Sequence, residues 1–212
     1  RDQFLAMAFA QLTLREGLRG IQETLNANKH GLYHMGFRCK AIARNTLAHA
    51  NEVRPWQIYG ELAMALMARA RKLYAGEPLA VELDATVFAL DSTTIDLCLA
   101  RFPWTPSQQS KAAVKLHVLL DLRGSIPDFI VISGAKHHDL HVFEYLEFIA
   151  GAYYIMDRAY QSFKVLYAMQ ESGAFFIVRG TKNIAFSVTE SRSVAKETGL
   201  RCDQTIRMTG SD

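Results

Sequence analysis

The spacing of hydrophobic and polar positions divides the chain into a helical first part, residues 1–84, and a mixed second part, residues 85–212. In the first part apolar residues recur at intervals of three and four, the period of an amphipathic helix. In the second part short, strongly apolar runs alternate with turns and helical segments, a pattern typical of an α/β domain. We therefore predict a small all-helical domain followed by an α/β domain.

The clearest helical stripe consists of Leu14, Leu18, Ile21 and Leu25. Thr13 precedes it, and a glutamate follows Thr13 by three residues, the spacing of a capping box at a helix N-terminus. This pattern predicts that the second helix of the chain begins directly after Thr13.

Three further helices are predicted in the first part: DQFLAMAFAQL at its start, a short helix near residues 46–53, and a long helix ending near Tyr74. Pro55 can open the long helix, because proline is well tolerated in the first helical turn. We interpret the Met and Leu residues of the long helix as core packing.

Five apolar runs of the second part predict strands: TVFAL, VKLHVLLD, DFIVIS, AYYIM and AFFIVR. The turn at residues 122–125 joins the second and third runs, which predicts an antiparallel hairpin. Helices are expected over LHVFEYLEFI and QSFKVLYAMQES, whereas the polar composition beyond Lys182 predicts no further element. The predicted order is β-β-β-α-β-α-β, an α/β fold with a mixed sheet.

Two of these runs are followed directly by an aspartate, Asp91 after TVFAL and Asp157 after AYYIM. A carboxylate at the mouth of a buried strand is costly unless it is paired, hydrogen-bonded or bound to a cation. Strands joined through a helix return parallel, so if the fourth strand lies beside the first, the two acids become neighbours. The pattern indicates a divalent-metal site; the alternative is that each aspartate only caps a following turn. Asp96 is expected in a surface turn.

Composition narrows the class of protein. The 212 residues, half of them hydrophobic, are enough for one large domain or two small ones. No apolar run approaches the roughly 20 residues that cross a bilayer, so we expect no membrane partner. Cys39, Cys98 and Cys202 are far apart and form no CxxC motif, which indicates reduced thiols in a cytoplasmic protein rather than disulfides or a zinc site.

The net charge of +3 resides in the first part of the chain, which has 11 Lys and Arg against 8 Asp and Glu. The excess is densest between Lys29 and Arg54, a stretch that includes Lys40 and Arg44. Such a distribution suits a polyanion partner such as DNA. A solvated, weakly basic surface accounts for the charge equally well.

Three segments together resemble the DDE transposases of bacterial insertion sequences, in particular the insertion sequence four group: DSTTIDLCLARFPW, KAAVKLHVLLDLRGSIP and YYIMDRAYQSF. The resemblance implies a ribonuclease-H-like fold and cutting and rejoining of DNA that depends on Mg²⁺, with Mn²⁺ as a substitute. It implies that Asp91 and Asp157 are the first two catalytic acids and metal ligands. The implied partner is double-stranded DNA at the ends of the element, bound by a homodimer in the nucleoid of a bacterium.

The family's third acid is a glutamate in the pattern Tyr, two residues, Arg, three residues, Glu, six residues, Lys. No tyrosine here has an arginine three positions on. The resemblance therefore implies a fragment, truncated at both ends and inactive as it stands. The alternative is a remnant that binds DNA or a partner without chemistry.

Two other interpretations concern residues near the acids. Lys115 and Arg158 either contact phosphate or balance the charge of Asp91 and Asp157.

A histidine-rich segment suggests a metal-dependent hydrolase, since histidine clusters bind Zn²⁺ or Mn²⁺. Its ligands would be His137, His138, Asp139 and His141, with Asp157 as a fifth. Against the hydrolase, Asp139 is explained as the N-terminal cap of the helix that follows it.

Overall fold

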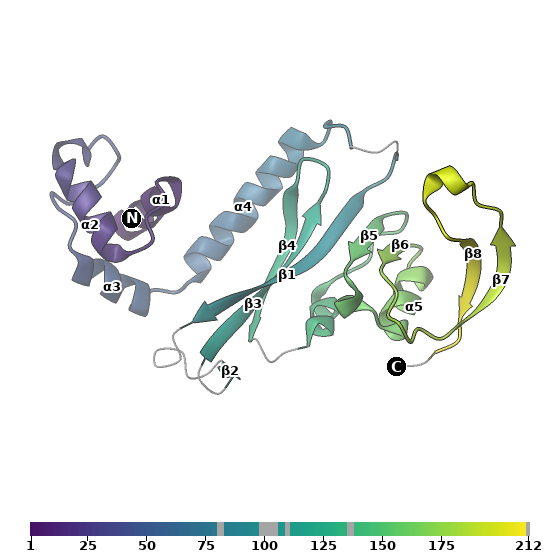
Figure 1. Ribbon diagram of the computed structural model, residues 1–212. Coiled ribbons are helices and arrows are strands. Elements are labelled where there is room, and N and C mark those ends of the chain that lie inside the picture. Colours follow the sequence, from purple (N-terminus) through teal and green to yellow (C-terminus); the bar gives the residue numbers. More distant parts are fainter. Residues whose placement is uncertain (80–82, 98–105, 109–110, 135–137, 211–212) are drawn as a thin grey trace. The chain divides into compact units, whose positions relative to one another are not determined.

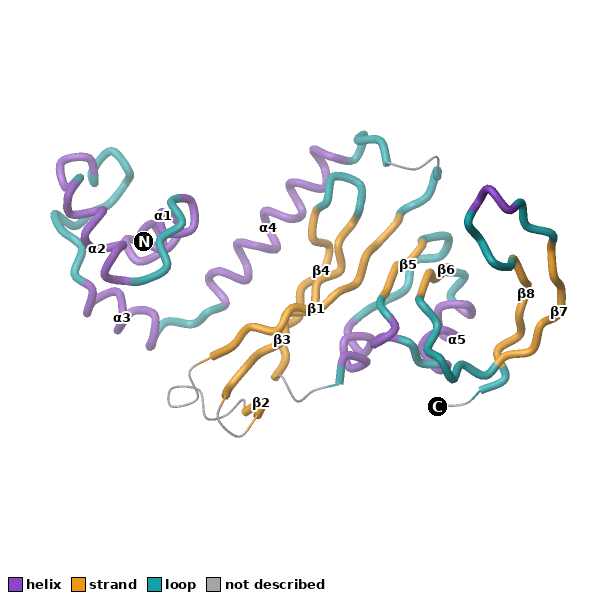
Figure 2. The backbone as a smooth tube through the Cα atoms, in the orientation of Figure 1, coloured by secondary structure: helices purple, strands orange, loops and turns teal. Residues whose placement is uncertain are grey.

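The structure is a computed structural model that describes residues 1–79, 83–97, 106–108, 111–134 and 138–210. Figure 1 and Figure 2 show its elements. The chain forms two compact units, residues 1–63 and residues 64–212, and the boundary lies within a helix. Each unit is described by itself.

The first unit is helical. It contains α1 (Asp2–Leu12), α2 (Leu18–Ala27), the short 3₁₀ helix η1 (Lys29–Gly31), α3 (Arg44–Val53) and the first turns of α4 (Gln57–Tyr74). Its core consists of apolar side chains from α1, α2, α3 and the loop between η1 and α3: Ala6, Ala10, Ile21, Leu25, Leu32, Phe37, Ile42 and Leu47. The predicted helical character of this part is confirmed.

The predicted capping box is wrong. Thr13 lies at the C-terminal cap of α1, where its hydroxyl donates a hydrogen bond to the Phe9 carbonyl at 2.7 Å. Leu14 then adopts a positive φ of 54°, which reverses the chain and leaves its side chain exposed. The second helix therefore begins after Gly17.

The long helix α4 begins two residues after Pro55, as expected. The interpretation of its Met and Leu residues as core packing is wrong for most of them. Met67 is buried, but Leu62, Met64, Leu66 and Leu73 are exposed.

The second unit is built on a mixed sheet in which all five predicted strands are present. The strands are β1 (Val87–Leu97), β2 (Pro106–Gln108), β3 (Lys111–Asp121), β4 (Ile126–Gly134), β5 (Tyr153–Met156) and β6 (Phe175–Val178). Their order is β2-β3-β1-β5-β6, with β4 also paired to β3. The pairs β1–β3 and β3–β4 are antiparallel, whereas β1–β5 and β5–β6 are parallel. The predicted hairpin and the predicted parallel crossovers are both confirmed.

Helical segments cover one face of this sheet: η2 (Asp139–Tyr145), η3 (Arg158–Tyr160) and α5 (Phe163–Glu171). Alternate residues of the strands point to this face and form the core with the helices: Phe88, Leu90, Leu119, Tyr154, Met156, Val142, Tyr160, Leu166 and Met169. α5 matches its prediction, but η2 is a 3₁₀ helix that stops at Tyr145 instead of the expected α-helix. The aromatic and β-branched residues of this segment have a modest α-helix propensity, which favours the short 3₁₀ helix over a longer α-helix.

The prediction that no element follows Lys182 is also wrong. β7 (Phe186–Arg192) and β8 (Asp203–Met208) form an antiparallel hairpin, with the 3₁₀ turn η4 (Lys196–Thr198) between them. Arg192 donates across the hairpin to Asp203 at 3.1 Å and to Thr205 at 2.8 Å. Polar cross-strand pairs of this kind stabilise a strand pair that buries little apolar surface.

Candidate functional site

The parallel register of β1 and β5 places the two predicted acids side by side. Leu90 on β1 is opposite Met156 on β5, and Asp91 and Asp157 are the next residues of the two strands. Because side chains alternate along a strand, Asp91 and Asp157 project from the face opposite to that of Leu90 and Met156. Leu90 and Met156 point into the covered core, so the two acids belong to the open face of the sheet.

Asp91 is not the last residue of its strand. β1 separates from β5 there but stays paired with β3 as far as Leu97, with Asp91 opposite Val118. The expectation that Asp96 lies in a surface turn is therefore wrong, since Asp96 is still within β1 and is opposite Ala113. The side chains of both acids are exposed.

Each acid accepts a hydrogen bond from the backbone N–H of the next residue. The Asp91 Oδ1 atom accepts from Ser92 at 2.8 Å, and the Asp157 Oδ1 atom accepts from Arg158 at 2.7 Å. Asp157 is thereby the N-terminal cap of η3, so the capping predicted as an alternative is present at this aspartate. These bonds orient the two carboxylates without burying them.

The donor set fits a hard divalent cation. Mg²⁺ is usually held by one or two carboxylates, with water and phosphate oxygens completing the coordination. Asp91 and Asp157 supply two such carboxylates next to each other. Within the described residues no group of three or more His, Cys, Asp or Glu side chains forms a closed metal cage. Asp91 and Asp157 are thus the residues of this candidate site that could hold a divalent cation.

Arg179 is a residue of this site that the sequence analysis missed. Val178 on β6 is opposite Met156, so Arg179 continues the row formed by Asp91 and Asp157. Its Nη2 atom lies 3.7 Å from Asp157 Oδ1, and both side chains are more than half exposed. The signal was present in the sequence: Arg179 follows the apolar run AFFIV as the acids follow theirs.

A network of buried polar side chains lies on the covered face of the sheet, the face opposite to that of the two acids. The Tyr160 hydroxyl is hydrogen-bonded to the Ser92 side chain and lies 3.3 Å from His117 Nδ1, and His117 Nε2 lies 3.2 Å from Ser133 Oγ. Tyr160 is 1% exposed and His117 2%. Burial raises the pKa of Tyr160 to about 12, opposed by the Ser92 hydrogen bond and reinforced by the charges of nearby aspartates, including Asp91. Burial lowers the pKa of His117.

Lys115 faces the same covered side of the sheet. Its ammonium lies 2.9 Å from Asp139 Oδ1, and both side chains are 19% exposed. The interpretation of Asp139 as a helix cap is wrong, because the cap position of η2 is occupied by His138 and Asp139 instead binds Lys115. The partner of Lys115 is thus Asp139, and both interpretations of Lys115, contact with phosphate and balance of the charge of Asp91 and Asp157, stay predictions. Arg158, in contrast, is exposed directly beside the acid pair.

The histidines suggested for a hydrolase do not form a ligand cluster in the part of the chain that is described. His137 lies outside the described residues. His138 is exposed, and His141 is paired with Glu144, Nδ1 to Oε1, at 3.1 Å. Of the cysteines, Cys39 and Cys202 are free thiols, and Cys98 lies outside the described residues.

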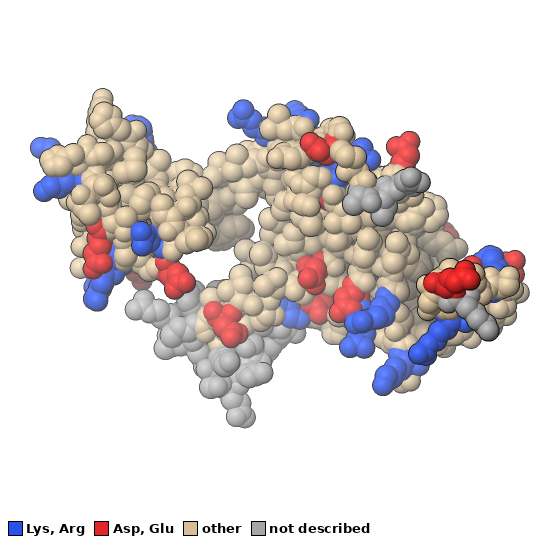
Figure 3. Space-filling view, turned by 45° about the horizontal axis from the view of Figure 1, so that its top comes forward, with Lys and Arg blue, Asp and Glu red and all other residues tan. Residues whose placement is uncertain are grey.

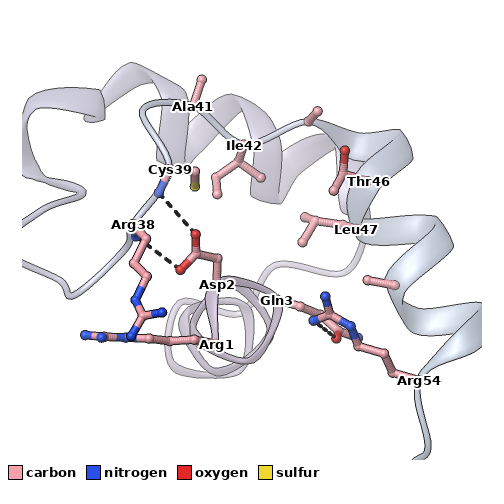
Figure 4. A pocket seen from close by; sticks show the side chains of 12 residues that line it. Arg1, Asp2, Gln3, Arg38, Cys39, Ala41, Ile42, Thr46, Leu47 and Arg54 are labelled. Atoms are coloured by element: carbon pink, nitrogen blue, oxygen red, sulfur yellow. Dashed lines mark hydrogen bonds between the residues drawn. The ribbon is translucent and has the colours of Figure 1, made fainter.

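In the first unit, Lys40 is exposed in the loop before α3, and Arg44 is the first residue of α3, where it lines a hollow together with Arg19. A second hollow, of about 490 Å³, is lined by three more arginines: Arg1, Arg38 and Arg54. Figure 4 shows that the Asp2 carboxylate in this hollow is directed toward the backbone N–H groups of Arg38 and Cys39, each at 3.1 Å.

Charges of both signs are present on the surface of the described residues. In the view of Figure 3 the acidic and basic side chains are interspersed over both units.

Comparison with known proteins identifies both parts of the chain. The family described as "Transposase DDE domain" matches residues 82–210, and a "Domain of unknown function (DUF4372)" matches residues 1–38. The curated protein "Probable transposase for insertion sequence element IS5377" from Geobacillus stearothermophilus is 35% identical over 95 residues. That alignment covers 45% of this chain and 25% of the relative, so the chain spans about a quarter of the relative's length. No solved structure matches.

Several expectations follow from these matches. DDE transposase domains have a ribonuclease-H-like fold, bind DNA and generally use divalent metal ions. The mixed sheet agrees with that fold. Among the described helices none is both long and apolar enough to span a membrane. Because the transposase domain accounts for more than half of its 212 residues, this chain belongs to the DDE transposase family.

Proposed function

We propose that this protein cuts and rejoins DNA in the transposition of an insertion sequence, with Asp91 and Asp157 as the ligands of its divalent cation. The observation that supports the proposal is the shared register of β1 and β5, in which Leu90 is opposite Met156 and each of the two distant aspartates directly follows one member of this pair. Mg²⁺ is the expected ion, because a few carboxylates completed by phosphate oxygens suit it, and Mn²⁺ is the expected substitute.

A bound cation would supply Lewis-acid activation of the attacking hydroxyl and neutralise charge on the scissile phosphate. The residues of this chain have supporting roles. Asp91 and Asp157 hold the ion, and the N–H groups of Ser92 and Arg158 orient their carboxylates. Arg158 and Arg179 would bind phosphate oxygens through their guanidinium groups, a role supported by their exposure and by the contact of Arg179 with Asp157.

The metal assignment is tested by titrating Mn²⁺ into the chain, with electron paramagnetic resonance and calorimetry as readouts. Asp91→Asn and Asp157→Asn should each weaken binding at least tenfold while leaving the circular dichroism spectrum unchanged. Asp96→Asn is the matched control, an exposed aspartate five residues further along β1, and should bind as the wild type does. Wild-type affinity in Asp91→Asn would refute the assignment.

We further propose that residues 1–84 bind double-stranded DNA at the ends of the element through phosphate contacts from Lys40 and Arg44. Such contacts release counterions, so affinity should fall steeply with salt. Lys40→Ala combined with Arg44→Ala should reduce both the affinity for a duplex and the salt slope, measured by fluorescence anisotropy. Arg192→Ala, an exposed arginine of the β7–β8 hairpin, is the control. An unchanged slope in the double variant would argue against this surface.

The assembly on DNA is proposed to be a homodimer, and the site of action the nucleoid in the cytoplasm of a bacterium. Sedimentation of the complex with a duplex carrying one element end tests the dimer. The complex should have the mass of two protein chains with their bound DNA, whereas a complex at saturation with the mass of one chain and one duplex would refute the dimer.

A second candidate is a remnant that binds DNA without chemistry. The absence from this sequence of the family's Tyr, Arg, Glu and Lys block favours it. We expect the 212-residue chain to bind cation and DNA but to yield no strand-transfer product with Mg²⁺ or Mn²⁺. Product formation that is lost in Asp91→Ala or Asp157→Ala would show that the chain is a complete enzyme.

A further inference from the structure

The short turn that begins at Asp157 directly follows β5 and ends at a buried side chain, Tyr160. Residues 157–160 form a single 3₁₀ turn, in which the Tyr160 N–H donates to the Asp157 carbonyl at 3.0 Å. Asp157 and Arg158 at its start are exposed, whereas Tyr160 at its end is 1% exposed. The turn therefore continues directly from β5 with exposed side chains and ends in a buried one.

The contacts of Tyr160 reach the strand that carries the other acid. Its hydroxyl is hydrogen-bonded to the side chain of Ser92, the residue after Asp91, and lies 3.3 Å from His117 Nδ1. Ser92 and His117 are opposite each other in the β1–β3 pair. His117 in turn lies 3.2 Å from Ser133 on β4. One phenol thus links the Asp157 turn to three strands of the sheet.

The ring of Tyr160 is fixed as well as its hydroxyl. It packs edge-on against Phe143 of η2, with ring centroids 6.0 Å apart, and against the His117 imidazole at 6.4 Å. A ring held on two sides leaves the hydroxyl few alternative positions. The hydroxyl also remains protonated over the physiological range, since burial raises the pKa of Tyr160 to about 12.

We propose that Tyr160 is a positioning residue for the acid pair: its buried hydroxyl, bound between Ser92 and His117, sets the separation of the Asp91 and Asp157 carboxylates. The inference rests on the proposed function of those two acids as metal ligands. In metalloproteins, residues that hold the metal ligands in position without contacting the ion have a similar role. Substitution of such a residue typically lowers the affinity for the metal ten- to a hundredfold.

The test compares Tyr160→Phe with Tyr154→Phe. Both tyrosines are buried in the same core, and the Tyr154 hydroxyl accepts from the Ile149 N–H at 3.0 Å, on a different set of partners. Each variant removes one buried hydroxyl and keeps the ring. In Mn²⁺ titrations Tyr160→Phe should weaken binding about tenfold, while Tyr154→Phe should stay within twofold of the wild type.

A second readout separates failure of the metal assignment from failure of this inference. Amide hydrogen exchange at Ser92 and Arg158 reports the two N–H groups that orient the carboxylates, with or without metal. Tyr160→Phe should accelerate exchange at both amides more than Tyr154→Phe does, even if the wild type binds no cation and the proposed function fails. Equal exchange and equal metal affinity in the two variants would overturn the positioning role, as would equal losses in both.

Discussion

Asp91 and Asp157, 66 positions apart in the sequence, occupy equivalent positions on adjacent parallel strands, each directly after one member of the Leu90–Met156 pair. Each carboxylate accepts a hydrogen bond from the next N–H in its own chain segment, at 2.8 Å and 2.7 Å. The two acids are thus oriented by the same kind of local hydrogen bond, from the backbone N–H of the next residue. Arg179 continues the row on β6, which adds a cation to the acid pair.

Arg179→Gln should tighten Mn²⁺ binding by about threefold at low salt, because the guanidinium competes with the ion for Asp157. The size follows from the up to about 1 kcal/mol typical of an exposed ion pair. The gain should disappear in 0.5 M salt, where such a pair is screened. Arg192→Gln, which removes a similarly exposed ion-paired arginine remote from the acids in sequence, should change nothing. Weaker metal binding in Arg179→Gln would show that the arginine supports the site instead.

Acid should destabilise the protein through His117. Burial holds the pKa of this imidazole below its ordinary 6.5, with the Asp139 charge opposing the shift and the Lys115 charge adding to it. The unfolded chain therefore takes up a proton that the folded state resists. The stabilisation is present above pH 6.5 and is lost as the pH falls through 6.5, at no more than about 1.4 kcal/mol per pH unit for one proton.

Urea unfolding between pH 7.5 and 5 measures this dependence. His117→Gln should flatten the slope of unfolding free energy against pH, although it lowers stability overall. His34→Gln, at an exposed histidine, is the control and should keep the wild-type slope. An unchanged slope in His117→Gln would mean that other groups cause the loss of stability at acid pH.

Alkali should destabilise the protein through Tyr160. Its pKa is raised from 10 to about 12, mainly by burial, so the folded state keeps its proton where the unfolded chain loses it. The stabilisation is complete below pH 10 and is lost as the pH rises toward 12, by roughly 3 kcal/mol in total. Relative to wild type, Tyr160→Phe should reduce the alkaline decline in urea unfolding, and part of it should remain because burial also raises the pKa of Tyr154. Tyr33→Phe, at an exposed tyrosine, should retain the full decline.

Lys115→Met should cost about 2 kcal/mol of stability, because it leaves Asp139 as a largely buried carboxylate without its 2.9 Å partner. Asp139→Asn should cost less, since a neutral amide is easier to bury. Adding Asp139→Leu to Lys115→Met should recover part of the loss in a double-mutant cycle of urea unfolding. Strictly additive losses would indicate that the two residues are not coupled.

Much of the fold was readable from local pattern. The five apolar runs, the turn at residues 122–125 and the helix predicted over QSFKVLYAMQES each depend on residues close in sequence, and the structure has an element at each. Elements whose form depends on context were missed: the 3₁₀ character of η2, the exposed Leu and Met face of α4, and the β7–β8 hairpin, which relies on cross-strand polar pairs. Thr13 was misassigned because a threonine can cap a helix start or bond back into a helix that ends.

The sequence by itself determined that Asp91 and Asp157 each follow an apolar run, because such a run and the residue after it are local facts. It also carried the family signature, in segments that match known transposases. Only the tertiary structure decided what lies around those acids. The strand register set Arg179 beside Asp157, and the packing of η3 brought Tyr160 between Ser92 and His117. Such contacts join residues from strands and turns far apart in the chain, and the pairing of those elements depends on burial of the whole core rather than on any short stretch of residues.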